Sequence, residues 1–350
     1  MILRRLSEAV GVSGDEGAIR DLIIPEIADH VTDLRIDPMG GITARQSGTG
    51  AEPRLKVMVC AHMDEVGFMV VGHSSEGRLR VTNVGGIDAR ILPGLRLRFG
   101  QDAVPGVVMW PPIHKGSNPK AIPLRELPID IGAKDKAEAQ GAVPLGTYGV
   151  FESEYRELGE KMLLGRAFDD RVGCALLIEL LQAGPHAVDL LASFSVQEEI
   201  GLRGARIAAN HLQPDIGIVL EGPPALDIPD PTQEPDDRNE RNPSNQLGAG
   251  PSLTTMDRSM IADPRLLRFV VETAERHGIP YQMRGLRGGG TDAGAIHLSN
   301  AGVPSAVISV PCRYVHAPAA MLHRDDYDQT LALLRALTQE LTQEVLAWDE

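Results

Sequence analysis

The sequence of 350 residues is poor in cysteine and has no long apolar run. Its three cysteines, Cys60, Cys174 and Cys312, are widely spaced and flanked by apolar residues. This odd, dispersed set argues against a disulfide framework or a cysteine-rich zinc site, and it predicts buried thiols in a reducing compartment. The first residues lack the apolar core of a signal peptide, and no stretch has the ~18 uninterrupted apolar residues of a membrane span. We therefore expect a cytoplasmic protein with no membrane partner.

The sequence is also short of positive charge. It has 34 lysines and arginines against 48 aspartates and glutamates, which gives a net charge of −14. Nucleic acids and anionic membranes attract surfaces of the opposite sign. Neither is therefore an expected partner.

Helical and strand patterns alternate through the second half of the sequence, which indicates an α/β fold. Apolar residues at helical spacing predict helices over 170–183, 203–212, 264–277, 291–300 and 325–348. Short apolar runs predict strands over 190–196, 216–220 and 305–310. The first third adds a predicted helix over 16–30 and a strand over 55–60. Such alternation is typical of a mostly parallel sheet with helices on both of its faces.

The pattern changes between residues 71 and 164. Short alternating apolar runs separated by glycine and proline predominate there, and only 134–140 has a helical period. This pattern predicts a small all-β domain inserted into the α/β domain, which would then comprise 1–70 and 165–350. The segment 229–251 is rich in proline and charge and almost free of large apolar residues, so we expect a mobile surface loop.

Histidines and carboxylates recur at the ends of the predicted strands and at the start of one helix. These residues are His62, Asp169, Asp170, Glu198, Glu199, Glu221 and His316. Ligand sites of open α/β sheets form at the carboxyl edge of the strands, so we expect these side chains to converge. Two imidazoles combined with several carboxylates suit a borderline divalent metal such as zinc, cobalt or manganese.

Each of these residues taken alone has a plainer explanation. A single histidine beside a strand is usually capped or solvated, and an acidic pair such as Glu198 and Glu199 usually lies on a solvated face. This pair, however, directly extends an apolar strand. Unpaired carboxylates buried there would be costly unless a cation neutralises them. The combined pattern therefore favours a metal site.

Several segments spread in order over nearly the whole chain resemble the M42 family of metallo-aminopeptidases, of the glutamyl and tetrahedral aminopeptidase type. They are GVSGDE (11–16), AHMDEVGFMV (61–70), GGID (85–88), IDIGAKDKAEAQ (129–140), GRAFDDRVG (165–173), VQEEIGLRGA (196–205), MDRS (256–259), GGGTDAGAIHLSNAGVPS (288–305) and VPCRYVH (310–316). The resemblance implies the fold of the dinuclear-zinc exopeptidases.

The same resemblance implies two metal ions per subunit. His62, Asp169 and Glu221 match the ligands of one ion, and Asp169, Glu199 and His316 match those of the other, so Asp169 would bridge them. Zinc and cobalt are the first candidates for both positions, and manganese is the third. Two ions about 3.5 to 4 Å apart lower the pKa of a shared water and hold both oxygens of the reaction.

Two further residues acquire roles from the resemblance. Glu198 matches the general base that takes a proton from the water between the metals, and Asp64 matches the carboxylate that orients His62 from behind. Neighbouring strand residues point to opposite sides, so Glu198 and Glu199 can both reach the metals only if the strand end bends.

The expected function is that of an aminopeptidase that trims the N-terminal residues of short peptides. The resemblance further implies a homododecamer built from dimers, with 71–164 as the assembly domain. Glu221 stands where the family's aminopeptidases usually have aspartate, and Ala317 where serine is common. The first of these departures favours an alternative, a metal-dependent carboxypeptidase or N-acyl amide hydrolase with the same site. A second alternative is a non-enzymatic peptide-binding assembly protein.

Three residues near the expected site remain ambiguous. Asp227 is either structural or a substrate contact, and Asp292 is either a helix cap or a polar group that lines the site. His297, inside the predicted helix 291–300, is expected to be packed or solvated rather than a ligand.

Overall fold

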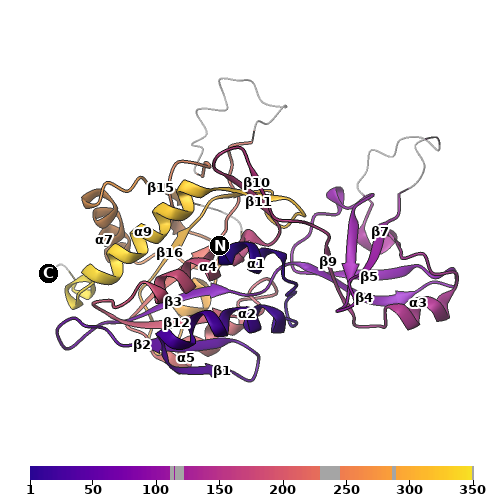
Figure 1. Ribbon diagram of the computed structural model, residues 1–350. Helices are drawn as coiled ribbons and strands as arrows, with labels where there is room; N and C mark the ends of the chain where they lie inside the picture. The colour runs from indigo at the N-terminus through magenta and orange to yellow at the C-terminus, as the bar shows by residue number, and fades with distance from the viewer. Residues whose placement is uncertain (111–113, 115–121, 229–244, 286–288, 349–350) are drawn as a thin grey trace.

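The largest element of the fold is an eight-stranded mixed sheet (Figure 1). The computed structural model describes residues 1–110, 114, 122–228, 245–285 and 289–348. The strands of this sheet, in spatial order, are β1 (Thr32–Ile36), β2 (Ile42–Gln46), β12 (Asp189–Ser195), β3 (Lys56–His62), β13 (Ile216–Glu221), β16 (Ser305–Ser309), β14 (Ser252–Met256) and β15 (Gln282–Gly285).

The centre of this sheet is parallel. The neighbouring pairs β12–β3, β3–β13 and β13–β16 are all parallel, whereas β1–β2, β2–β12 and β14–β16 are antiparallel. The predicted α/β class is confirmed, and the antiparallel pairs lie toward the two edges. All the predicted strands of the α/β part occur in this sheet.

Helices cover both faces of the sheet. Along β3, Val57, Val59 and Ala61 belong to one apolar cluster, while Met58 and Cys60 belong to another on the opposite face. A strand buried on both faces explains why its sequence is a continuous apolar run. The first cluster lies under α1 (Ile2–Glu8), α2 (Gly17–Ile27), α4 (Phe168–Gln182), α7 (Pro264–Arg276) and α9 (Arg324–Glu340). The second lies under α5 (Arg203–Leu212) and α8 (Ala293–Ile296).

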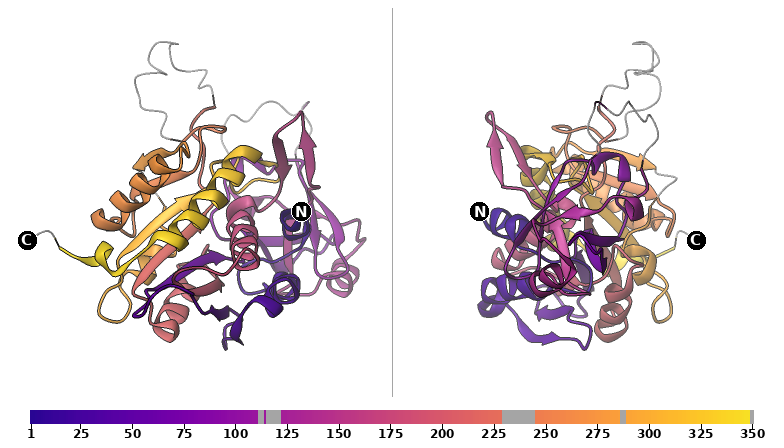
Figure 2. Two further views of the ribbon diagram at one scale, coloured as in Figure 1. Left: turned by 60° about the vertical axis from the view of Figure 1, so that its left-hand side comes forward. Right: turned by 90° about the vertical axis from the view of Figure 1, so that its right-hand side faces the viewer.

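Two predicted helices are shorter than their periodicity suggested. The helix expected over 291–300 is only the four-residue α8, and the terminal helix expected over 325–348 ends at Glu340, followed by a short 3₁₀ turn, Gln343–Leu346. Leu341 adopts an extended conformation and is buried, and Arg265 stacks 3.8 Å from the ring centroid of Trp348. Packing of the last segment therefore overrides its helical pattern. Figure 2 shows α9, in yellow, lying along the sheet.

A closed barrel lies beside the α/β part and is formed by the central segment of the chain (Figure 1). Its strands, in barrel order, are β4 (Gly67–His73), β5 (Leu79–Val84), β8 (Ile129–Asp130), β7 (Val104–Val108), β6 (Arg96–Phe99) and β9 (Tyr148–Phe151). The barrel segment also carries α3 (Lys136–Ala142), as the helical period there predicted. Phe68 and Phe151 pack edge to face in the barrel core, with their ring centroids 5.3 Å apart.

A third sheet joins the end of the expected insert to the C-terminal part of the chain. It consists of β10 (Arg156–Leu158), β11 (Met162–Gly165), β18 (Ala320–His323) and β17 (Cys312–Arg313). Strands β10 and β11 carry the chain from the barrel toward Asp169, which follows β11. His316 lies in the segment between β17 and β18.

The expected loop over 229–251 falls largely outside the described residues. Its last part, from residue 245, is packed: Asn245 is buried, and the backbone N–H groups of Gly248 and Gly250 donate to Asp326 at 2.7 and 2.8 Å. The expectation of a mobile loop is therefore wrong for this part. All three cysteines are buried and unpaired, as predicted. No helix in the described ranges is long and apolar enough to cross a membrane.

Candidate metal centre

The predicted ligands come together at the carboxyl edge of the central parallel strands. His62 is the last residue of β3, Glu221 is the last residue of β13, and Glu199 follows β12. Asp169 lies in the first turn of α4, where its φ and ψ angles are not helical, and His316 follows β17. The parallel arrangement places these strand ends side by side, which is why residues far apart in sequence share one site.

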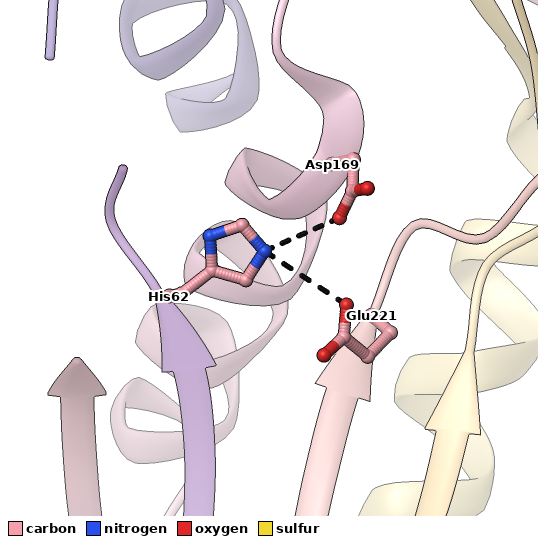
Figure 3. Close-up of side chains that lie close together, drawn as sticks. All are labelled: His62, Asp169 and Glu221. Atoms are coloured by element: carbon pink, nitrogen blue, oxygen red, sulfur yellow. Dashed lines mark hydrogen bonds and ion pairs between the residues drawn. The ribbon is translucent and has the colours of Figure 1, made fainter. Parts of the chain in front are cut away.

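One group of possible ligands comprises His62, Asp169 and Glu221 (Figure 3). The Nε2 atom of His62 lies 3.3 Å from Oδ1 of Asp169 and 3.8 Å from Oε2 of Glu221. The three ligand atoms all lie within 4.8 Å of one another. They can therefore face a single ion.

The second group comprises Asp169, Glu199 and His316. The Nε2 atom of His316 lies 2.9 Å from Oε1 of Glu199 and 3.5 Å from Oδ2 of Asp169. The two carboxylate oxygens of Asp169 thus face different histidines. This is the geometry that a carboxylate bridging two ions requires.

The charges at this site suit two divalent cations. Burial raises the pKa of the Glu221 carboxyl well above its usual range, and the neighbouring charge of Glu198 adds to the shift. One carboxylate oxygen of Glu221, Oε1, is buried without a hydrogen-bond partner. Burial lowers the pKa of His316, but hydrogen bonds to Asp169 and Glu199 outweigh it and raise that pKa to about 11. Imidazole and carboxylate donors of this kind fit zinc, cobalt or manganese.

Glu198 reaches the site because the chain bends at the end of β12. Gln197, the residue before Glu198, has a φ of 57°, in the left-handed region, and its N–H donates to Glu16 at 3.1 Å. The bend interrupts strand alternation, and Oε2 of Glu198 comes within 3.9 Å of Nε2 of His62. Burial raises the pKa of Glu198 well above its usual range, although the charge of His62 opposes this.

Asp64 is fully buried behind the site and connects three of its parts. Its main-chain oxygen lies 3.0 Å from Nδ1 of His62, while its carboxylate oxygen Oδ1 lies 3.4 Å from the same nitrogen. Its carboxylate also accepts the backbone N–H groups of Glu198 at 3.0 Å and Glu199 at 3.2 Å, and the hydroxyl of Ser13 at 2.6 Å. Asp64 therefore fixes both the imidazole and the bend that carries the two glutamates.

A cavity of about 830 Å³ opens in front of these side chains. Five of the predicted residues, Asp169, Glu198, Glu199, Glu221 and His316, line one side of it. The remaining wall includes Leu226, Arg258 and Arg284. Burial lowers the pKa of Arg284 to about 10, against the opposing charges of Glu221, Asp169 and Asp257, so its guanidinium is charged at neutral pH.

Sequence reasoning missed Arg284, because the feature that marks it, its burial, appears only in the fold. The residue lies in the short strand β15 and is buried, which is unusual for arginine unless it has a partner. A charged residue within the segment QMRG has no distinguishing pattern without the fold, because exposed edge strands also carry such residues.

The ambiguous residues take structural positions. Asp227 forms an ion pair with Arg313 at 2.7 Å and does not line the cavity. Asp292 makes no capping hydrogen bond; its buried carboxylate accepts the hydroxyl of Ser195 and contacts Sγ of Cys60 at 3.6 Å. His297 bonds the carbonyl of Ala293 at 2.8 Å, one turn earlier in the chain.

The fold and the site together define a class: an α/β protein with two histidine and carboxylate groups that share one aspartate. The chain belongs to the M42 peptidase family, because residues 40–333 match the family described as M42 glutamyl aminopeptidase. It is an M42 aminopeptidase and hence an enzyme, which answers the alternative of a non-enzymatic assembly protein.

Individual members of the family are similar over nearly the full length. The chain is 35% identical to the lysyl aminopeptidase of Pyrococcus furiosus, covering 97% of this chain and 96% of that protein. A solved TET aminopeptidase from Thaumarchaeota archaeon SCGC AB-539-E09 has a TM-score of 0.90 and 33% identity, covering 99% of this chain and 98% of that one. The TET1 peptidase of Pyrococcus horikoshii, which can assemble into a tetrahedron or a large octahedral shell, has a TM-score of 0.82 and 32% identity, covering 97% and 99% of the two chains.

Proposed function

We propose that this enzyme removes N-terminal residues from short peptides with the help of two divalent cations. His62, Asp169 and Glu221 would hold one cation, and Asp169, Glu199 and His316 the other. The observation that carries this proposal is that the two oxygens of Asp169 face the two histidines, 3.3 and 3.5 Å away, at the wall of a cavity. When bound, the cations supply an activated water and polarise the peptide carbonyl.

The protein's own residues account for the proton movements. The buried carboxylate of Glu198, which lies 3.9 Å from Nε2 of His62 and belongs to neither ligand group, takes a proton from the attacking water. The same carboxyl then returns the proton to the leaving amine. Asp64 keeps the imidazole of His62 in one orientation and holds the backbone of Glu198 in place. The free amine of the substrate would lie beside Glu221.

A second candidate, cleavage of N-acyl amides, is favoured by Glu221. A glutamate is one methylene longer than the aspartate usual at this position, so it changes the space beside the metal. Its Oε2 lies 3.8 Å from Nε2 of His62, against 3.3 Å for Oδ1 of Asp169. The two reactions differ in whether the substrate amine is free.

Hydrolysis of aminoacyl p-nitroanilides should require a free amine and an added divalent cation. We expect full activity after addition of zinc, cobalt or manganese and loss of activity after chelation. The N-acetylated form of each substrate should be hydrolysed at a rate at least about 10²-fold lower, because mispositioning of a substrate at a catalytic centre costs about that much. Absorbance of released nitroaniline measures both forms. Faster hydrolysis of the acetylated form would establish the amide hydrolase instead. Release of C-terminal residues from N-blocked peptides would establish a carboxypeptidase.

We also propose that the barrel mediates assembly into a dodecamer built from dimers, within the reducing cytoplasm to which unpaired cysteines are suited. Val107 in the barrel strand β7, and Met109 and Trp110 directly after that strand, are 44%, 38% and 49% exposed. Apolar side chains gathered in this way are typical of contact surfaces. The inserted segment 71–164 would thus serve assembly, and 1–70 with 165–350 catalysis.

Light scattering coupled to size exclusion should detect a particle of twelve 37.7-kDa subunits. The variant Trp110→Glu should give smaller species, because it places a charge within the apolar contact. Arg80→Glu, which changes an exposed barrel residue away from these three, provides the control. A wild-type monomer would contradict the assignment of the barrel to assembly.

A further inference from the structure

Three successive backbone N–H groups just after β12 are each bound by a buried carboxylate. The N–H of Glu198 donates to Oδ1 of Asp64 at 3.0 Å, and that of Glu199 donates to Oδ2 of Asp64 at 3.2 Å. The first of the three, the N–H of Gln197, donates instead to Oε1 of Glu16 at 3.1 Å. The chain turns at Gln197, so the hydrogen bond at the turn itself belongs to Glu16.

Gln197 has a backbone conformation that residues with a side chain rarely adopt. Its φ of 57° lies in the left-handed region, where Cβ comes close to the following carbonyl oxygen. Such a conformation persists where the surrounding structure fixes it. On one side the start of α5 does so: the carbonyl oxygen of Val196 accepts the N–H of Gly204 at 2.9 Å, and that of Gln197 accepts the N–H of Arg203 at 3.3 Å. On the other side, Glu16 accepts the N–H of Gln197.

Glu16 is itself held in place at both its main chain and its side chain. Its main-chain oxygen accepts the N–H groups of Ile19 at 3.0 Å and Arg20 at 3.1 Å, at the start of α2. The atom that binds Gln197, Oε1, also accepts the N–H of Gly14 at 2.8 Å. The residue is 4% exposed, and burial of a carboxylate is costly unless hydrogen bonds compensate for it. A carboxylate fixed in this way can impose a conformation on Gln197.

The segment that carries Glu16 also supports Asp64. The hydroxyl of Ser13 donates to the carboxylate of Asp64 at 2.6 Å, and the carbonyl oxygen of Gly11 accepts the N–H of Glu65 at 2.9 Å. Residues 11–16 therefore connect the two carboxylates that bind the turn.

Glu16 has no direct part in binding the cations or the substrate. It belongs to neither ligand group and is not among the residues that line the cavity of about 830 Å³. Its influence on the reaction passes through Gln197 to the next residue, Glu198, whose Oε2 lies 3.9 Å from Nε2 of His62. A displacement of about 1 Å caused by a distant substitution can cost about 10²-fold in rate.

We propose that Glu16 is a positioning residue: by accepting the N–H of Gln197, it keeps the chain in the left-handed turn that directs the carboxylate of Glu198 to the site. The inference rests on the proposed function, in which Glu198 is the general base. Loss of Glu16 should therefore reduce the rate of the chemical step, whereas the affinity for substrate and the number of bound cations should be preserved.

Glu16→Ala should lower kcat by about 10- to 10²-fold and leave KM within about threefold, with both cations bound. Glu16→Gln keeps an oxygen that can accept the N–H of Gln197, so its kcat should stay within about threefold of the wild-type value. Asp15→Ala removes the exposed carboxylate of the preceding residue and is the matched control. Kinetics with an aminoacyl p-nitroanilide and metal analysis measure these quantities.

Gln197→Gly tests the turn directly. Glycine adopts a positive φ without the steric cost that Cβ imposes. Added to Glu16→Ala, this substitution should raise kcat by about fivefold or more, the factor that corresponds to the lower end of that cost. The single variant Gln197→Gly provides the reference for the double variant. No recovery in the double variant would contradict an action of Glu16 through the turn.

Hydrogen exchange supplies a readout that does not depend on turnover. Measured by mass spectrometry, the amide of Gln197 should exchange at least about 10-fold faster in Glu16→Ala than in the wild-type protein, because its acceptor is gone. Glu16→Gln should retain the wild-type rate. An unchanged exchange rate in Glu16→Ala would overturn the proposal, and so would faster exchange with an unchanged kcat. A fall in kcat that accompanies loss of a cation would also overturn it, because a ligand would then be affected.

Failure of the proposed function would look different. Absence of hydrolysis of every free-amine substrate by the wild-type protein would contradict that function, whereas the exchange rates would still decide whether Glu16 holds the turn. If Glu16→Ala does not fold, Glu16→Asp replaces it, because this variant keeps the charge but withdraws the acceptor oxygen by one methylene. It should show the same reduced kcat and the same faster exchange, and wild-type values of both would overturn the proposal.

Discussion

Replacing Glu198 with glutamine should lower kcat by about 10²-fold or more, the usual contribution of a general base, and leave both cations bound. Glutamine has the same shape as glutamate but cannot take a proton from water. Glu198 lies 3.9 Å from His62 and belongs to neither of the two ligand groups, so its loss should not empty the site. Steady-state kinetics and metal analysis of the same preparation measure the two effects.

The neighbouring Glu199 provides the matched control. Its Oε1 lies 2.9 Å from Nε2 of His316 and it belongs to the second ligand group. Glu199→Ala should therefore lower the number of bound cations toward one per subunit, and activity should fall with it. Near-normal turnover of Glu198→Gln, or two cations in Glu199→Ala, would show that the roles of the pair are exchanged.

The sequence is sufficient to predict the candidate ligands because each lies at a point where its element ends. His62 and Glu221 terminate buried apolar strands, and Asp169 lies in the first turn of a helix with an apolar face. Parallel strands bring such ends to one edge of the sheet, so residues far apart in the sequence are expected to lie close together there. The role of Asp169 as a bridge between two cations was implied only by the family resemblance. That the two oxygens of Asp169 face different histidines depends on a non-helical first turn, which has no signature in the sequence.

Features that depend on tertiary packing were beyond prediction. The last helix ends at Glu340 although the apolar period continues, because Leu341 is buried in an extended conformation. Asp292 stands at a position typical of a helix cap, yet its carboxylate turns into the core toward Ser195. Arg284 illustrates the same point for the cavity wall: only the fold shows that its buried Nε atom has no hydrogen-bond partner.

Replacing Asp64 with asparagine should lower the affinity for the cations by about 10- to 100-fold, the usual effect of removing a residue that orients a ligand. Asp64 is buried and accepts hydrogen bonds at both carboxylate oxygens, from the N–H groups of Glu198 and Glu199. An asparagine would present an NH₂ group to one of these donors. The bend that carries both glutamates would then lose a hydrogen bond and face a buried mismatch, which costs about 1–3 kcal/mol of stability.

Ser13→Ala separates the positioning role of Asp64 from a general effect of altering this buried region. The Ser13 hydroxyl donates to the same carboxylate at 2.6 Å but contributes no atom to either ligand group. Its loss should cost about 1 kcal/mol of stability, a typical single hydrogen bond, and leave cation affinity within about threefold of wild type. Titration of metal-free protein with zinc, together with thermal unfolding, measures both quantities. Asp64→Asn with wild-type affinity and kcat would show that the main-chain oxygen of Asp64, 3.0 Å from Nδ1 of His62, orients the imidazole by itself.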